Sequence, residues 1–337
     1  MIDRRLGRCL ITGIALICNV LITHGETVDY MPKFSGGIRS RWEMETESGN
    51  SRFTVRSARV MMNGSIAAPI DYYLAVDLCD NGKMKFLDGW IKLKATKDLA
   101  FQAGQYIMPF GVEPSRSPLE YYFNNRSFLS KYACFIRSVG VKADYAVPGT
   151  QLKLEGGVFN ASSTSDQDSW SRQLAFSSRA TYKLDNMKFV AGFQSTSPDS
   201  VRINLVDACV NWSAGRWVVE GEYVNRHYTN QAYKTTHAYS MYANYAMPIS
   251  AGIFNRLSFQ GRFDGMTDNS TGTRVNGELV TNQKARNRVT IGSTISYIKT
   301  PMHADIRLNY EKYFYHEGVV APEGSGDKVS LELVLRF

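Results

Sequence analysis

The chain has 337 residues, of which 44% are hydrophobic, 12% aromatic and 21% charged, with a formal net charge of +8. This length and composition suit one large all-β domain or two small domains. The positive charge belongs to a chain that we expect to be exported, so no nucleic-acid partner is predicted. It suits an anionic solute or an anionic lipid head group, and the alternative is that it serves solubility alone.

The first 25 residues differ from the rest and predict a secretory signal peptide. Basic residues gather at 4–8, an apolar run occupies 9–23, and Gly25 is small enough to precede a cleavage site. The run is too short for a transmembrane helix, and no longer one follows. A lipoprotein signal at Cys18 is the alternative, although a bulky residue precedes that cysteine. Cleavage removes three arginines and one aspartate, a net +2, so the remaining chain carries +6.

Three cysteines remain after residue 25, namely Cys79, Cys134 and Cys209. The number is odd and no CxxC pair exists, so neither a disulfide framework nor a zinc site is indicated. Cys79 and Cys134 both fall where a strand meets a loop, on the same expected side of the molecule, which leaves a disulfide between them open. No metal and no cofactor is predicted.

From residue 33 onward, apolar and polar residues alternate in short stretches, which is the pattern of half-buried strands rather than of helices. In 328–337, for example, three leucines share one face while Ser330 and Glu332 share the other. The alternation slips within the second stretch, which predicts a β-bulge near Arg56–Arg59. Each stretch is near or above the length with which a tilted strand crosses a bilayer. The sixteen stretches are 33–47, 51–65, 70–79, 84–95, 99–107, 137–147, 150–160, 172–183, 187–196, 202–212, 216–227, 237–247, 254–266, 286–299, 302–314 and 328–337.

The connections between these stretches alternate in length. Those after even-numbered stretches are short, whereas several after odd-numbered stretches are long, and the longest is 108–135. Transmembrane barrels have short turns at one rim, long loops at the other and an even number of strands, whereas a soluble β-sandwich has no reason for this rhythm. The chain also ends in Phe337 on an alternating stretch, as outer-membrane barrels commonly do. We therefore predict that residues 26–337 form a 16-stranded antiparallel transmembrane β-barrel in the bacterial outer membrane.

The connection 108–135 has no sustained helical or strand period. A segment of this length without regular structure is usually functional or disordered, and disorder fits poorly because the segment is rich in Tyr and Phe. Its three cations, Arg116, Arg126 and Lys131, outnumber its two carboxylates. As the third loop of the external rim, it is expected to fold inward and narrow the barrel. An ordinary surface loop packed on its own side chains is the alternative.

A barrel of sixteen strands leaves an aqueous channel, whose selectivity follows from its width and the charges that line it. An anion that crosses a narrow section gives up hydration, which basic donors replace. We therefore expect passive diffusion of small hydrophilic solutes with a weak to moderate anion preference. For each cation the alternative is a solvated wall charge that is paired across strands. The candidate constriction and anion-binding residues are Arg116, Arg126 and Lys131 in the loop and Arg56, Lys92 and Lys94 on the wall.

The stretch Gly104–Glu113, GQYIMPFGVE, resembles the Gly-Gln…Pro-Phe-Gly…Glu segment of the phosphate-selective porin O/P family. The resemblance implies a homotrimeric sixteen-strand porin among outer-membrane lipids, with an inward third loop and often an anion preference. Ile107 and Met108 stand where many relatives have Lys, so the resemblance implies an anion pore more firmly than a phosphate-specific one. Three further segments resemble the family: 53–60, 88–92 and 137–141.

Two other functions fit a barrel. A non-conducting barrel that acts as an adhesin or binds lipid gives the same linear pattern, since a plugged lumen alternates like an open one. A barrel hydrolase needs a serine activated by a base, but the four histidines after residue 25 lie near the ends of stretches or in connections, and no Ser–His pairing emerges. The HExxH and GxSxG motifs are also absent from the sequence. We therefore predict that the protein is not an enzyme.

Overall fold

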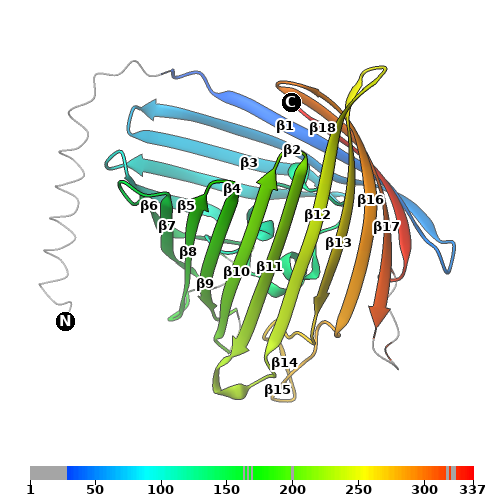
Figure 1. Ribbon diagram of the computed structural model, residues 1–337. Helices are drawn as coiled ribbons and strands as arrows, with labels where there is room; N and C mark the ends of the chain where they lie inside the picture. Colours follow the sequence, from blue (N-terminus) through cyan, green and yellow to red (C-terminus); the bar gives the residue numbers. More distant parts are fainter. Residues whose placement is uncertain are drawn as a thin grey trace, which may run out of the picture.

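The computed structural model describes residues 29–161, 164, 167, 170–198, 201–315, 319 and 324–337. Within these residues sixteen antiparallel strands close into a barrel (Figure 1), in which β1 pairs with β18 to complete the ring. The predicted 16-stranded antiparallel barrel is therefore confirmed. The predicted signal peptide, 1–25, lies outside the described residues.

The strand boundaries agree with the sequence pattern to within about four residues. The largest difference is at β12, which continues through Pro248 by a register shift and ends at Ala251. A two-stranded hairpin, β14 (Arg274–Val275) and β15 (Glu278–Leu279), lies in the connection between β13 and β16. The barrel strands are β1 (Lys33–Glu45), β2 (Ser51–Ala67), β3 (Ile70–Asp80), β4 (Lys83–Lys94), β5 (Leu99–Ile107), β6 (Arg137–Ala146), β7 (Leu152–Asn160), β8 (Leu174–Leu184), β9 (Met187–Thr196), β10 (Ile203–Ala214), β11 (Trp217–Tyr228), β12 (Thr236–Ala251), β13 (Phe254–Met266), β16 (Arg286–Lys299), β17 (Met302–Tyr315) and β18 (Lys328–Arg336).

The two faces of the strands have the polarity of a membrane barrel. On β18, Leu333 is 52% exposed, whereas Ser330 and Glu332 are fully buried. This is the reverse of a soluble protein, whose buried face is apolar, and it matches an outward apolar band around a polar interior. Among the described residues no helix has the length and apolar character needed to cross a membrane.

A β-bulge in β2 brings two arginines to the same face. Arg39 pairs with Ser57 but Ser40 pairs with Val55, so Arg56 is the extra residue, and the predicted bulge is confirmed. Residues three apart on a regular strand point to opposite faces. The inserted residue changes that parity, and Arg56 and Arg59 line one cavity.

The two rims differ in their connections. At one, the short-connection rim, neighbouring strands are joined by a few residues after β2, β4, β6, β8, β10, β12 and β16. The other, the long-connection rim, carries the segment 108–136 and the β14–β15 hairpin, which projects beyond the barrel strands in Figure 1.

All three cysteines within the described residues are free thiols, so the open possibility of a Cys79–Cys134 disulfide is not realised. Cys79 lies on β3, where its Sγ is 3.7 Å from the Val55 carbonyl oxygen. Cys134 packs instead on an apolar cluster that includes Ile203 and Val224 of β10 and β11. Burial raises the pKa of the Cys134 thiol well above its ordinary value, so the thiol stays neutral.

Candidate functional site

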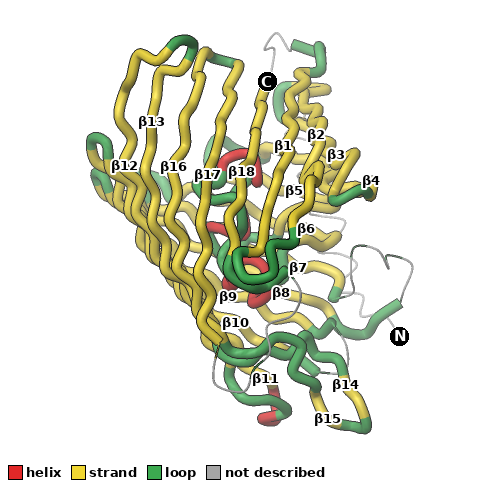
Figure 2. The backbone as a smooth tube through the Cα atoms, turned by 90° about the vertical axis from the view of Figure 1, so that its right-hand side faces the viewer, coloured by secondary structure: helices red, strands yellow, loops and turns green. Residues whose placement is uncertain are grey.

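The β5–β6 segment, residues 108–136, contains three short helices: η1 (Glu113–Ser115), η2 (Pro118–Glu120) and η3 (Leu129–Ala133). A proline lies in the first turn of η1 and of η2, where the missing N–H costs nothing. η2 contacts β1 and β18, whereas η3 contacts β11, β12 and β13. Helices of this segment are drawn in red between the strands in Figure 2. The segment therefore touches strands that are far apart around the ring.

Carboxylates of β11 hold the beginning of the segment. Glu222 accepts hydrogen bonds from the backbone N–H groups of Val112 (2.6 Å) and Glu113 (3.0 Å). Two residues along the strand, both oxygens of Glu220 accept from Arg116 Nη2 at 2.8 Å. Hydrogen bonds with a charged partner are the strong ones, so the segment is firmly attached here.

Arginines of the wall hold the middle of the segment. Three consecutive carbonyl groups, at 124–126, each accept a hydrogen bond from one of them. These arginines lie on three different strands, β1, β13 and β16, which fixes the path of the backbone. The bonds are Arg39 Nη2 to Asn124 O (2.9 Å), Arg262 Nη1 to Asn125 O (2.9 Å) and Arg288 Nη2 to Arg126 O (2.6 Å).

All three of these arginines have carboxylate partners of their own. Arg39 pairs with Glu332 at 2.9 Å, and Arg262 pairs with Asp264 at 3.1 Å. Arg288 pairs with Asp264 at 3.0 Å and with Glu311 at 3.1 Å. All six side chains are buried. A buried charge is tolerated when it is paired and fully hydrogen-bonded, so these cations support the fold and leave little charge for a solute.

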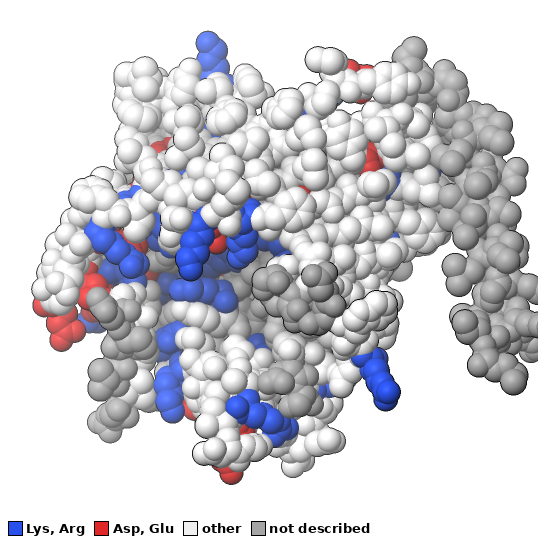
Figure 3. Space-filling model, turned by 180° about the vertical axis from the view of Figure 1, so that it is seen from behind, with Lys and Arg blue, Asp and Glu red and all other residues white. Residues whose placement is uncertain are grey.

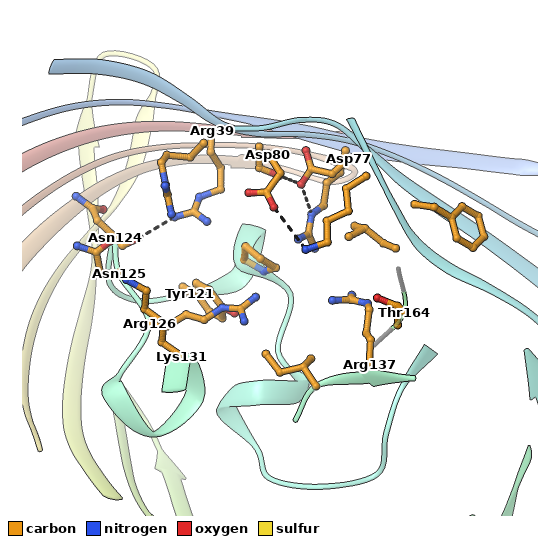
Figure 4. Close-up of a pocket in the computed structure, with 18 residues that line it drawn as sticks. Arg39, Asp77, Asp80, Tyr121, Asn124, Asn125, Arg126, Lys131, Arg137 and Thr164 are labelled. Carbon is orange, nitrogen blue, oxygen red and sulfur yellow. Dashed lines mark hydrogen bonds and ion pairs between the residues drawn. The ribbon is translucent and has the colours of Figure 1, made fainter. Parts of the chain in front are cut away.

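A cavity of about 520 Å³ lies beside the segment, between β1–β4 and the start of β6. Figure 4 shows Arg126 and Lys131 of the segment on one side of it and Arg39, Asp77 and Asp80 of the strands on the other. Among the described residues that line this cavity, which we call the arginine cavity, seven are cations and two are carboxylates. The cations are Arg39, Arg56, Arg59, Lys85, Arg126, Lys131 and Arg137.

Four of the seven cations are neutralised by a carboxylate. The pairs are Arg39–Glu332 (2.9 Å), Arg59–Asp77 (3.0 Å), Arg137–Asp88 (3.0 Å) and Lys85–Asp80 (3.8 Å). On the face shown in Figure 3, Lys and Arg side chains gather around a hollow region with few carboxylates in view.

The other three, Arg56, Arg126 and Lys131, have no carboxylate partner among the described residues. The Arg56 guanidinium donates to the Asn81 side chain, and its buried Nε has no partner within the described residues. The guanidinium carbon of Arg126 lies 5.5 Å from the centre of the Tyr121 ring. This cation–π contact is made with an uncharged ring, so it does not neutralise the arginine. The same holds for Lys131, whose Nζ lies 4.8 Å from the centre of a tyrosine ring.

The structure thus brings three of the six candidate residues together and separates the other three. Arg116 is paired with Glu220 on the far wall. Lys92 and Lys94 do not line the arginine cavity. Their Nζ atoms lie 2.8 Å from carboxylate oxygens of Asp144 and Asp71 respectively.

Four cations of the arginine cavity were not among the candidate constriction residues predicted from the sequence, namely Arg39, Arg59, Lys85 and Arg137. The signal for Arg59 is the slip in alternation within β2, because a bulge moves a later residue to the other face. Arg137 is the first residue of β6, directly after the segment. Its position next to the longest connection is the available signal.

Tyr121 separates the arginine cavity from a second one. The second cavity has a volume of about 440 Å³, opens toward the short-connection rim and is lined by Arg216, Arg256 and Arg307, among others. Tyr121 lines both cavities. Burial raises the pKa of its phenol, so the ring stays neutral. The β5–β6 segment therefore divides two basic chambers at this tyrosine.

Comparisons with known proteins agree with the barrel fold. Residues 39–181 match the family model of phosphate-selective porin O and P, which confirms the resemblance predicted from the sequence. A search of curated proteins gave no match.

The fold is similar to that of solved porins and channels. The anion-selective porin from Comamonas acidovorans is 10% identical over 91% of this chain and 98% of that chain, with a TM-score of 0.60. The outer membrane channel DcaP of Acinetobacter baumannii is 12% identical over 91% of this chain and 97% of its own, with a TM-score of 0.63. The trimer form of OmpT from Vibrio cholerae is 12% identical over 91% and 98% of the two chains, with a TM-score of 0.59.

At these identities the structural likeness concerns the fold alone. Together with the family match, it supports a passive-diffusion porin in the bacterial outer membrane. It also favours a channel over an enzyme.

Proposed function

We propose that this chain, which matches the phosphate-selective porin O and P family over 39–181, is an anion-preferring porin narrowed by its β5–β6 segment. Support for the narrowing comes from the two sets of attachments. Arg39 of β1 and Glu222 of β11 both bond to the segment, and these two strands lie on nearly opposite sides of the ring. A chain attached at both sides crosses the lumen between them.

The observation that carries the anion preference is the unpaired state of Arg56, Arg126 and Lys131 in the arginine cavity. A paired cation presents a dipole to a passing ion, whereas an unpaired one presents a full charge. Low-dielectric walls around a narrow section focus that field. A small anion is therefore attracted toward the gap beside Tyr121, while a small cation is repelled.

The magnitude of this effect is modest. A unit charge acts on an ion about 8 Å away with roughly 0.5 kcal/mol in water. Three such charges give about 1.5 kcal/mol, which screening at 0.1 M salt reduces to about half. The charges attract chloride and repel potassium by about 0.7 kcal/mol each, so we expect a preference for chloride of up to roughly tenfold at 0.1 M, falling as the salt concentration rises.

The solute class is small anions in general. Ile107 and Met108 stand where many family members have Lys, and Met108 is buried against Tyr106 and Phe159. That position therefore supplies no charge for a phosphate group. Arg56 and Arg126 can still form bidentate contacts with phosphate or carboxylate, so organic and inorganic anions both fit the proposal.

We further propose a homotrimer in the lipids of the outer membrane, with the long-connection rim outside. OmpT, whose fold is similar, is described in a trimer form. An outward apolar band on the strands suits lipid contact. Gel migration of unheated and heated samples after mild cross-linking tests the oligomer, because a trimer gives a species about three times the monomer mass.

The direct test of selectivity is the reversal potential of purified protein in planar bilayers across a potassium chloride gradient. Anion selectivity that weakens as salt rises is the expected result, with chloride conductance reduced by added phosphate. A cation-selective pore would overturn the anion proposal. A sealed barrel without conductance would overturn the porin function and favour the adhesin or lipid-binding alternative.

A further inference from the structure

Beneath the start of the β5–β6 segment, four side chains of β10 and β11 gather on one face of the wall. Asp207 and Cys209 are two residues apart on β10, as are Glu220 and Glu222 on β11, so each pair shares a face. Cys209 lies directly opposite Glu222 in the strand register. Ligand atoms of Cys209, Glu220 and Glu222 lie within 4.8 Å of one another, and all three residues are buried.

Asp207 adds an unbalanced charge to this cluster. It is 1% exposed, its carboxyl group faces that of Glu222, and neither of its oxygens accepts a hydrogen bond from a donor among the described residues. A buried carboxylate without a partner is costly. Its position beside a second carboxylate raises that cost further, because like charges repel.

The surrounding cations leave this charge uncompensated. Arg116 pairs with Glu220, and Arg179, whose charge acts on Asp207, is paired with Glu155 at 2.7 Å. Glu113, which also approaches Glu222, is balanced by Arg262 at 3.7 Å. Three carboxylates and one cation leave a formal charge of −2, or −3 once Cys209 binds as a thiolate, and a single divalent cation offsets two of these charges.

We propose that β10 and β11 hold a divalent metal ion of the zinc class through Cys209, Glu220 and Glu222, with Asp207 as a fourth ligand or hydrogen-bonded neighbour. One thiolate with carboxylates is a donor set for a borderline metal, since calcium and magnesium take oxygen ligands alone. Bonds of about 2.0–2.3 Å put tetrahedral ligand atoms roughly 3.3–3.8 Å apart. Closure of the cluster by about 1 Å therefore suffices.

The metal would also fix the β5–β6 segment. Both oxygens of Glu222 already accept backbone N–H groups of Val112 and Glu113, and each oxygen retains a second lone pair for a metal. Glu222 would then join the ion to the beginning of the segment. This role does not depend on whether the lumen prefers anions.

The test uses the full mature barrel refolded in detergent, with Co²⁺ as a spectroscopic probe and Zn²⁺ as its competitor, each added during and after refolding. One equivalent of Co²⁺ with a thiolate-to-cobalt absorption band, displaced by Zn²⁺, is expected. The matched control is Cys79→Ser/Cys134→Ser, which leaves Cys209 as the one thiol of the mature chain and should keep the band.

Two variants test the ligands. Cys209→Ser should abolish the band, and Asp207→Asn should weaken Co²⁺ binding roughly 10–100-fold, the usual range for a supporting residue. Absence of stoichiometric binding in the wild type would overturn the metal site and leave a proton shared between Asp207 and Glu222. A band that survives Cys209→Ser, or that disappears in the double cysteine control, would also overturn the assignment. If Cys209→Ser fails to refold, the Co²⁺ band of the Cys79→Ser/Cys134→Ser control decides the assignment, because Cys209 is then the one thiol that can produce it.

Discussion

The two sides of the lumen hold the β5–β6 segment with opposite charges. On β11, Glu220 and Glu222 accept hydrogen bonds from the segment's N–H and guanidinium groups. Elsewhere on the wall, arginines such as Arg39 of β1 and Arg288 of β16 donate to its carbonyl groups. The comparison teaches that attachment and selectivity are separate tasks, because the cations that attach the segment are paired. In the proposed function, the charge offered to solutes comes from cations whose side chains do not attach the segment, such as Lys131.

The largest effect is expected from Arg288→Ala on the basic side. This change leaves Asp264 and Glu311 with one cation fewer and releases the Arg126 carbonyl. Breaking a buried pair costs about 3–5 kcal/mol, so the folded form should disappear at a clearly lower urea concentration on unheated gels. Arg256→Ala is the control, because that guanidinium makes a single long hydrogen bond, to Ser296 Oγ (3.4 Å). Equal loss in both variants would contradict the structural role of the Arg288 network.

A smaller effect is expected from Glu222→Ala on the acidic side. Two backbone N–H groups lose their acceptor, at about 1–3 kcal/mol each, while the repulsion with Asp207 is relieved. The net result should be local release of the segment, seen as faster trypsin cleavage after Arg116 and noisier single-channel currents. Glu222→Gln keeps one carbonyl acceptor and should lie between the alanine variant and the wild type. Unchanged cleavage in Glu222→Ala would show that the acidic attachment is dispensable.

Tyr121→Ala addresses the gap between the two chambers. Removal of the ring widens the gap that we propose as the narrowest section, so single-channel conductance should rise roughly 1.5–2-fold. Because Tyr121 is buried, a loss of stability should accompany this rise. Tyr145→Ala removes the same side chain from an exposed position on β6 and should leave conductance unchanged. Conductance that is insensitive to Tyr121→Ala would move the narrowest section elsewhere in the lumen.

The barrel could be predicted from the sequence because its main signals are local. Alternation of apolar and polar residues with a period of two predicts the strands, and the lengths of the connections predict the two rims. A slip of one residue in that alternation predicts the bulge at Arg56. Gly104, in the stretch that carries the family resemblance, has a further local reason. Its φ is +131°, and a Cβ there would lie 2.2 Å from the Gly89 carbonyl oxygen of the neighbouring strand, β4, so glycine is required at that position.

The state of each lumen charge could not be predicted, because pairing depends on contacts between distant residues. Lys92 and Asp144 are 52 positions apart, and Arg116 and Glu220 are 104 apart. The same reason hid the cluster around Cys209, whose neighbours come from two strands in register rather than from a spaced motif. A list of lumen-facing cations is therefore available from sequence, but the subset that remains unpaired requires the structure.

The central claim is that unpaired cations, rather than net charge, give the pore its anion preference. The most direct measurement compares reversal potentials of two triple variants that each remove three positive charges from candidate positions. Loss of most of the anion preference is predicted for Arg56→Ala/Arg126→Ala/Lys131→Ala. The matched variant, Lys92→Gln/Lys94→Gln/Arg116→Gln, takes its charges from ion pairs outside the arginine cavity. The carboxylates that it leaves behind therefore lie away from that cavity, and the variant should keep most of the preference. Equal shifts in both variants would contradict the claim, because net charge alone would then explain the selectivity.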